Sequence, residues 1–204
     1  MAGRSGNPLA QLAREGRNKR GGRTARPHVD GRPVGRPRGG IRDGAVREAV
    51  GEARHVIDLF AGCGTFSLPL ADQAEVHAVE GDAAMTAALD HGWRMSTGLK
   101  PVTTEARDLF RRPLLPDELA KTDAVVIDPP RAGAEAQIAE IVKAMPPVLA
   151  YVSCNPVTFA RDAAVLIAAG YTLKWVQVVD QFRWSSHVEL AAQFTAPEVQ
   201  RKRK

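Results

Sequence analysis

One cysteine of this sequence stands where a thiol could act as a nucleophile. Cys154 follows the apolar run VLAYVS, and after it come Asn155, a favoured helix cap, and Pro156, favoured at a first helical position. The positive end of a helix dipole favours the thiolate form of a cysteine. The sequence therefore predicts a reactive thiol at Cys154. For Cys63, the other cysteine, we expect a buried and inert side chain.

A glycine turn in DLFAGCGTF supplies a second candidate site. Gly62 and Gly64 allow a tight turn and let a ligand lie against the backbone before the next helix. Ser67 takes the third glycine position of the dinucleotide fingerprint GxGxxG, so NAD binding is disfavoured. Glu80 comes 22 residues after Asp58, where an acid can reach ribose hydroxyls. Together these residues predict a ligand of the adenosine type.

Two more acids follow predicted strands. Asp108, in ARD, either accepts a hydrogen bond from an adenine amino group or caps the short turn that follows it. Asp128 begins DPPRAG, where two prolines restrict the backbone and prevent a direct continuation into a helix. We expect Asp128 to be held at the edge of the sheet, near Cys154.

Short apolar runs alternate with helical patterns from Arg54 onward, which is typical of β-α units around a mostly parallel sheet. The predicted strands are residues 55–60, 76–80, 102–106, 123–128, 148–153, 172–179 and 188–194, and the predicted helices are 65–72, 82–96, 133–145 and 156–169. No helix fits between the last two strands, so we expect them to pair antiparallel. The prediction is an α/β protein with a seven-stranded sheet. Ligands of such sheets bind at the carboxyl ends of the strands.

The composition indicates one folded domain. The chain has 204 residues, of which 44% are hydrophobic and 25% charged. No run is long and apolar enough for a membrane helix or a signal peptide, and we expect a cytoplasmic protein. The two cysteines are far apart, which argues against a disulfide framework or a metal site.

The net charge of +5 is unevenly distributed. Residues 1–50 carry a local charge of +8 and the terminal RKRK adds four positive charges, whereas residues 51–200 carry −7. Residues 1–50 also contain no aromatic side chain and ten of the 18 glycines. We therefore expect a disordered basic segment at 1–50, a folded domain at 51–196 and a basic tail at 197–204. The basic segments are either solvated extensions or arms that bind phosphates.

Several of these motifs together resemble one enzyme family, the S-adenosylmethionine-dependent RNA 5-methyluridine methyltransferases. The resemblance depends on DLFAGCGTF, VEGD, DPPRAG, SCNPVTFARD and DQFRWSSHVE, and it covers about residues 54–195. It implies a class I methyltransferase domain with a Rossmann-like sheet. Arg131 supports this choice. Sequences similar to the amino-directed methyltransferases have an aromatic residue directly after a D/N-P-P motif, whereas this chain has Arg131 at that position.

The resemblance also implies roles for individual residues. Cys154 would add to carbon 6 of uracil, and Glu189 would be the general base that later removes the proton from carbon 5. Asp128 and Arg131 would bind the substrate, and His187 would be structural. The residues implied to bind S-adenosylmethionine are Asp58, Phe60, Gly62, Gly64, Glu80, Asp108 and Asp128. No metal ion is implied.

The chain departs from the family before its first strand. Family members usually have an RNA-binding β-barrel and a Phe-Gln segment there, and residues 1–50 contain neither. The partner is expected to be ribosomal or transfer RNA, recognised through the basic segments or through a separate chain that supplies the missing region. Two alternatives stay open, an RNA 5-methylcytosine methyltransferase and a non-catalytic fragment that binds S-adenosylmethionine. In each case we expect the domain to fold without residues 1–50.

Overall fold

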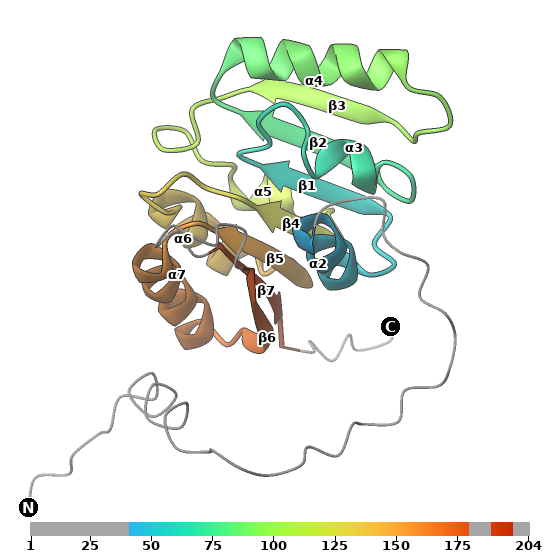
Figure 1. Cartoon of the computed structure of the whole chain (residues 1–204). Helices are drawn as coiled ribbons and strands as arrows, with labels where there is room; N and C mark the ends of the chain where they lie inside the picture. Colours follow the sequence, from blue (N-terminus) through green and yellow to red (C-terminus); the bar gives the residue numbers. More distant parts are fainter. Residues whose placement is uncertain (1–40, 180–188, 198–204) are drawn as a thin grey trace, which may run out of the picture. The chain divides into compact units, whose positions relative to one another are not determined.

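The computed structural model describes residues 41–179 and 189–197, which form a layered α/β unit around one sheet (Figure 1). The strands are β1 (His55–Leu59), β2 (Glu75–Glu80), β3 (Val102–Ala106), β4 (Ala124–Ile127), β5 (Val148–Ser153), β6 (Thr172–Val179) and β7 (Glu189–Thr195). The helices are α2 (Ile41–Val50), α3 (Ser67–Leu70), α4 (Ala83–Met95), α5 (Pro116–Leu119), α6 (Glu135–Ala144) and α7 (Pro156–Ala168).

The seven strands follow the order β3-β2-β1-β4-β5-β7-β6. β1 to β5 are parallel, and β7 pairs antiparallel with both β5 and β6. The predicted α/β class and the antiparallel last pair are therefore confirmed. The central strand β4, AVVI, is buried at every residue, as expected for a parallel strand covered on both faces.

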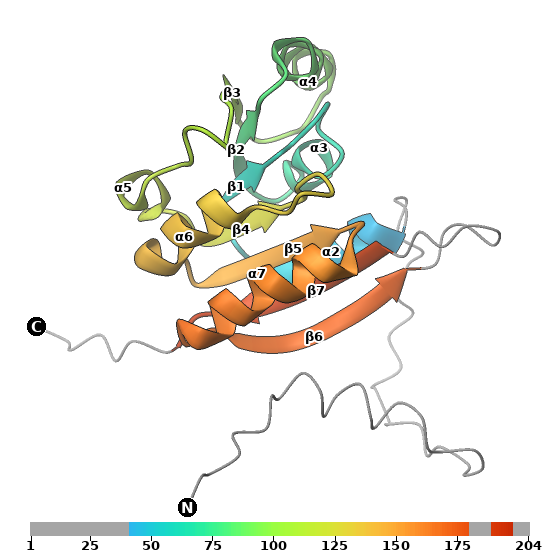
Figure 2. The same ribbon diagram turned by 90° about the vertical axis from the view of Figure 1, so that its left-hand side faces the viewer.

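Each face of the sheet has its own hydrophobic core, because alternate residues of a strand point to opposite faces. Ile57 and Tyr151 belong to the core beneath α5, α6 and α7, whereas Val56 and Val152 belong to the core beneath α2, α3 and α4. Figure 2 shows α6 and α7 on one side of the sheet and α2 on the other.

The domain boundary predicted at residue 50 is wrong, because residues 41–50 form α2. Ala45, Val46, Ala49 and Val50 are each at most 3% exposed, and together they form one apolar stripe along this helix. The Ala49 carbonyl accepts a 2.7 Å hydrogen bond from Gln193 Nε2 on β7. This short stripe was not predicted, because residues 1–50 as a whole are rich in charged residues and glycine. The remainder of the predicted disordered segment, residues 1–40, lies outside the described residues.

Two other elements differ from the prediction. The helix predicted at 65–72 is limited to Ser67–Leu70, and Pro69 within it has no N–H for a helical hydrogen bond. The short helix α5 was not predicted, and its Leu119 is 1% exposed. In the part of the chain that the structure describes, no helix is long and apolar enough to cross a membrane.

We expect Val46→Ala to lower the free energy of unfolding by about 2 kcal/mol, because the substitution removes two buried methyl groups from the core beneath α2. Denaturant titration measures the change. Glu48→Ala, which alters an exposed residue of the same helix, is the matched control and should change stability by no more than about 0.5 kcal/mol. Equal stability of both variants would show that α2 does not belong to the cooperative unit.

Candidate active site

The candidate active site lies at the carboxyl ends of the parallel strands. Leu59 on β1 is in register with Val79 on β2 and Ile127 on β4, so Phe60, Glu80 and Asp128 follow at the same edge. A cavity of about 460 Å³ opens there. Its lining residues are Phe60, Glu80, Gly81, Asp108, Leu109, Phe110, Asp128, Pro129, Pro130, Cys154 and Glu189. The cavity has the size of a small-molecule site.

The glycine turn after β1 has a left-handed backbone at three residues. Phe60 has φ 60°, Gly62 has φ 58° and Gly64 has φ 96°. A Cβ at Gly64 would lie 2.9 Å from Leu89 Cγ, so a larger residue does not fit against α4. A Cβ at Gly62 would meet nothing within 4 Å. One glycine thus allows close packing, and the other leaves an open backbone surface that a ligand can approach.

Glu80 joins this turn to the cavity. Its two carboxylate oxygens accept 2.9 Å hydrogen bonds from the backbone N–H groups of Gly62 and Asp82. A carboxylate has about four acceptor positions, so two remain for ligand hydroxyls. The structure therefore brings the predicted ribose-binding acid to the glycine turn and holds it in place.

Asp108 caps the turn that follows it, which is one of the two roles that its sequence context left open. Its Oδ1 accepts hydrogen bonds from the N–H groups of Phe110 (3.0 Å) and Arg111 (3.3 Å), which caps the following turn. The residue also lines the cavity, as does Phe110, whose ring centroid lies 5.4 Å from that of Phe60. Leu109 and Phe110 were missed as lining residues, because an apolar side chain in a loop has no distinctive sequence signal.

The pairing of β5 with β7 places Cys154 and Glu189 at the same level of the sheet. Ser153 is opposite Leu190, so the antiparallel register places Cys154, the next residue on one strand, level with Glu189, the preceding residue on the other. Both residues line the cavity, and Cys154 is partly exposed. Residues 35 positions apart in sequence are thereby brought to one wall of the cavity. His187 lies outside the described residues.

The loop after β4 separates the two predicted substrate residues. Asp128 lines the cavity. The Arg131 side chain is exposed and does not belong to the lining, although its carbonyl accepts hydrogen bonds from Asn155 Nδ2 (2.9 Å) and Thr158 Oγ1 (3.2 Å). In this structure Arg131 therefore lies outside the cavity, and its backbone joins the loop after β4 to the start of α7.

Asp58 and Cys63 also differ from expectation. Asp58, which the resemblance implied to bind S-adenosylmethionine, is 0% exposed and lies outside the cavity lining. Its Oδ2 accepts a 2.6 Å hydrogen bond from Ser67 Oγ. Cys63 is exposed, which corrects the expectation of a buried thiol, because its neighbouring glycines turn the chain outward at this point.

Burial raises the pKa of Asp58 from 3.8 to about 7, and the negative charges of Asp128 and Glu80 add to this shift, while the hydrogen bond from Ser67 opposes it. The folded chain therefore binds more protons than the unfolded chain between about pH 4 and pH 7. The contribution of Asp58 to the free energy of unfolding therefore falls as the pH rises through that window. Above about pH 7 this contribution no longer changes.

We expect Asp58→Asn to remove this part of the pH dependence, since the amide stays neutral and can still accept the hydrogen bond from Ser67. Relative to the unsubstituted chain, the free energy of unfolding of the variant should rise by roughly 2–4 kcal/mol between pH 4 and pH 7. Denaturant titrations across this range measure the difference. Asp117→Asn, which changes an exposed carboxylate on α5, should leave the pH dependence as it was. Parallel pH profiles of Asp58→Asn and the unsubstituted chain would contradict the assignment.

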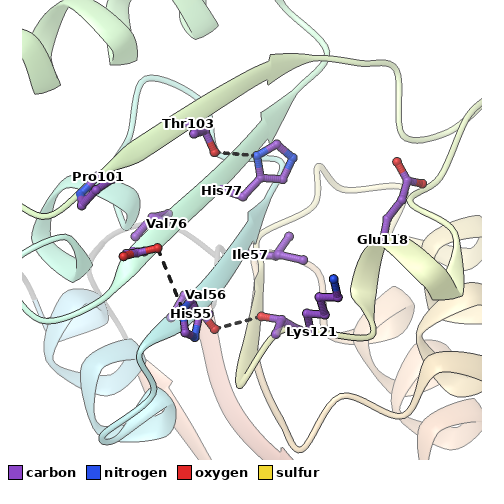
Figure 3. Close-up of a pocket in the computed structure, with 11 residues that line it drawn as sticks. His55, Val56, Ile57, Val76, His77, Pro101, Thr103, Glu118 and Lys121 are labelled. Atoms are coloured by element: carbon purple, nitrogen blue, oxygen red, sulfur yellow. Dashed lines mark hydrogen bonds and ion pairs between the residues drawn. The ribbon is translucent and has the colours of Figure 1, made fainter.

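A second cavity, of about 250 Å³, lies toward the amino-terminal ends of β1 and β2 (Figure 3). His55, His77 and Thr103 line it, and His77 Nδ1 lies 2.9 Å from Thr103 Oγ1. Within residues 41–179 and 189–197, no group of histidine, cysteine or acidic side chains is arranged to hold a metal ion. We take the cavity at the carboxyl edge as the candidate active site, because the thiol of Cys154 and several carboxylates line it.

The strand order, the glycine turn and the acid at the end of β2 define a class I S-adenosylmethionine-dependent methyltransferase domain. A family model described as tRNA (uracil-5-)-methyltransferase matches residues 93–195, half of the chain. The chain belongs to this family of RNA methyltransferases, which confirms the resemblance found in its motifs.

Individual relatives agree with this assignment. An RNA methyltransferase of Mesorhizobium japonicum is 56% identical over 77% of the chain and 39% of its own length. The 23S rRNA (uracil(1939)-C(5))-methyltransferase RlmD of Halomonas elongata is 44% identical over 69% of the chain and 29% of its own length. A similar solved structure is the crystal structure of the Pyrococcus abyssi tRNA (uracil-54, C5)-methyltransferase in complex with S-adenosyl-L-homocysteine. It matches this chain with a TM-score of 0.65 and 28% sequence identity, and the match covers 74% of this chain and 37% of the Pyrococcus abyssi chain. The chain thus spans about two fifths or less of the length of these relatives.

Proposed function

We propose that this chain transfers a methyl group from S-adenosylmethionine to carbon 5 of a uridine in RNA, through a covalent adduct with Cys154. The observation that carries the proposal is one cavity lined both by Glu80, which ends β2, and by Cys154 and Glu189, which lie at β5 and β7. The family to which the chain belongs supports the same reaction.

The residues present fit S-adenosylmethionine. Glu80 is held by Gly62 with acceptor positions to spare, and the open face of Gly62 lets a ligand approach the backbone. Asp108 lines the same cavity and would accept a hydrogen bond from an adenine amino group, and Phe60 and Phe110 supply apolar surface. When bound, S-adenosylmethionine supplies the methyl group as part of a sulfonium, which needs no metal ion for activation.

The chemistry of the protein residues begins with Cys154. Its thiolate forms a bond to carbon 6 of the uracil, and the electron pair of the 5,6 double bond moves to give an enolate with a nucleophilic carbon 5. Once carbon 5 has gained the methyl group, Glu189 takes the proton that remains on it. The electron pair of that C–H bond re-forms the double bond and expels the thiolate. Asp128, which lines the cavity, would hydrogen-bond the edge of the ring.

The substrate class within RNA is part of the proposal. The relatives include an enzyme named for 23S rRNA and one named for tRNA, so both ribosomal and transfer RNA are candidates. The proposal also includes a separate chain that supplies further RNA contacts. If such a chain exists, adding cell extract to the assay described below should raise the activity.

The test is methyl transfer from labelled S-adenosylmethionine to ribosomal and transfer RNA that lack the modification, at low salt, where phosphate contacts are strongest. Digestion followed by mass spectrometry should identify 5-methyluridine. Labelled 5-methylcytidine would replace the proposal by the cytosine alternative. Binding of S-adenosylmethionine with no transfer to either RNA, with or without extract, would favour a non-catalytic fragment.

A further inference from the structure

The loop that follows β4 is tied to the first turns of α7 by several hydrogen bonds. The Arg131 carbonyl accepts from Asn155 Nδ2 and Thr158 Oγ1, and the Ala132 carbonyl accepts from Arg161 Nη2 at 3.2 Å. We call the four helix residues that contact the loop the α7 clamp. They are Asn155, Thr158, Arg161 and Asp162.

Asp162 lies at the centre of the α7 clamp. It is 1% exposed, and its Oδ2 accepts from the Ala134 N–H at 2.9 Å and from Tyr151 Oη at 2.6 Å. Its Oδ1 accepts from Arg161 Nε at 2.9 Å and lies 2.8 Å from Arg161 Nη2. A buried carboxylate is stable when its oxygens are satisfied in this way. Asp162 thus joins the loop, the helix and the strand β5 at one point.

Gly133 shows how closely the loop approaches the helix. It has φ 79°, and a Cβ placed on it would lie 2.6 Å from Arg161 Nη2, 2.9 Å from Asp162 Oδ2 and 3.0 Å from Thr158 Cβ. No side chain fits between them without moving the loop. The contact can therefore be disturbed from the loop side, with every residue of the α7 clamp unchanged.

The two ends of this contact carry residues of the proposed reaction. The loop begins with Asp128, and α7 begins two residues after Cys154; both Asp128 and Cys154 line the cavity. Asp162, Arg161 and Tyr151 do not line it, so they do not contact a uracil ring bound in the cavity. Any effect they have on the reaction must act through the loop and the helix.

We propose that Asp162 and Arg161 are positioning residues, which hold Asp128 at a set distance from Cys154 so that a uracil ring is oriented for attack at carbon 6. This inference rests on the proposed function and adds to it the residues that align the ring with the thiolate. Loss of the contact leaves the cavity residues in the chain but misaligns them. A misplacement of about 1 Å can slow a reaction by about 10²-fold.

The test compares Asp162→Asn, Gly133→Ala and Arg161→Gln with the unsubstituted full chain. Asp162→Asn and Arg161→Gln weaken the ion pair within the α7 clamp, and Gly133→Ala moves the loop. Asp90→Asn is the matched control, because Asp90 also pairs with an arginine, Arg94, but on the exposed surface of α4. We expect kcat to fall about 10- to 100-fold in the three variants. The KM for RNA should stay within about twofold, and the control should be unchanged.

Further measurements separate positioning from loss of folding. Circular dichroism should show each variant folded at the assay temperature, and Arg161→Lys, which keeps the charge, should recover part of the rate lost in Arg161→Gln. Folded variants of Asp162 and Gly133 with an unchanged kcat would overturn the positioning role.

Failure of the proposed function would be recognised separately, because the unsubstituted chain itself would then transfer no methyl group. In that case hydrogen exchange of residues 131–134 measures the contact directly. The amide of Ala134 should exchange at least about tenfold faster in Asp162→Asn than in the unsubstituted chain, since it loses a buried hydrogen bond to a carboxylate. Exchange in β1 to β3 should not change. Equal exchange at Ala134 would overturn the contact itself.

Discussion

The Cys154→Ala variant should form no covalent complex with RNA, and it should transfer methyl groups at least about 10³-fold more slowly than the unsubstituted chain. Carbon 5 of uracil is a weak nucleophile until a group adds to carbon 6. Among the described residues, Cys154 is the thiol that lines the cavity. Affinity for S-adenosylmethionine, measured by calorimetry, should stay close to that of the unsubstituted chain, because Glu80 and the Gly62 N–H that holds it follow β2 and β1, whereas Cys154 follows β5.

The matched control is the other cysteine. Cys63 is exposed and lies outside the cavity lining, so Cys63→Ala should still form the covalent complex. Denaturing electrophoresis with labelled RNA detects the complex in both variants. The assignment of Cys154 as the nucleophile would be wrong if Cys154→Ala still formed a covalent complex, or if only Cys63→Ala lost it.

The Glu189→Gln variant should fail in the opposite way and accumulate a covalent complex. The glutamine amide cannot take the proton from carbon 5, so the thiolate cannot be expelled after the methyl group has been transferred. Turnover should fall by about 10²- to 10⁴-fold, the usual contribution of a general base. The trapped RNA should carry the methyl group, which a double label on RNA and on S-adenosylmethionine can measure.

A glutamate at the other edge of the sheet provides the comparison for this variant. Glu75 is an exposed residue at the start of β2, and Glu75→Gln should turn over normally without trapping RNA. If Glu189→Gln turns over at the normal rate, the base is a different group. A trapped complex that lacks the methyl group would place Glu189 before the transfer step and contradict the assigned order.

The amino-acid sequence by itself determined most of the local structure. Seven strands and four helices were predicted near their observed positions, because buried strands and capped helices leave short-range patterns. Asn155 caps α7 by accepting a 3.0 Å hydrogen bond from Val157, as its position before Pro156 predicted. The residue types of the site were equally local, since Glu80, Asp128 and Cys154 each directly follow or end a strand.

The helix α2 shows where local patterns were insufficient. Its stripe of Ala45, Val46, Ala49 and Val50 is apolar enough to pack but too small to stand out in a basic, glycine-rich segment. The sheet supplies the surface that makes this stripe stable, and Gln193, more than 140 residues away, bonds to the end of the helix. Helix stability that comes from tertiary packing is not encoded in the helix alone.

Only the tertiary structure decided how the parts of the site are joined. The sequence predicted that the last two strands pair with each other, but not that β7 lies between β5 and β6, and this insertion brings Glu189 level with Cys154. Likewise, SCNPVTFARD contains Asn155, Thr158 and Asp162, yet their contact with the loop after β4 appears only when α6 and α7 pack on one face of the sheet. Strand order and helix packing depend on which apolar faces become buried together. These are long-range interactions, which residue spacing along the chain does not record.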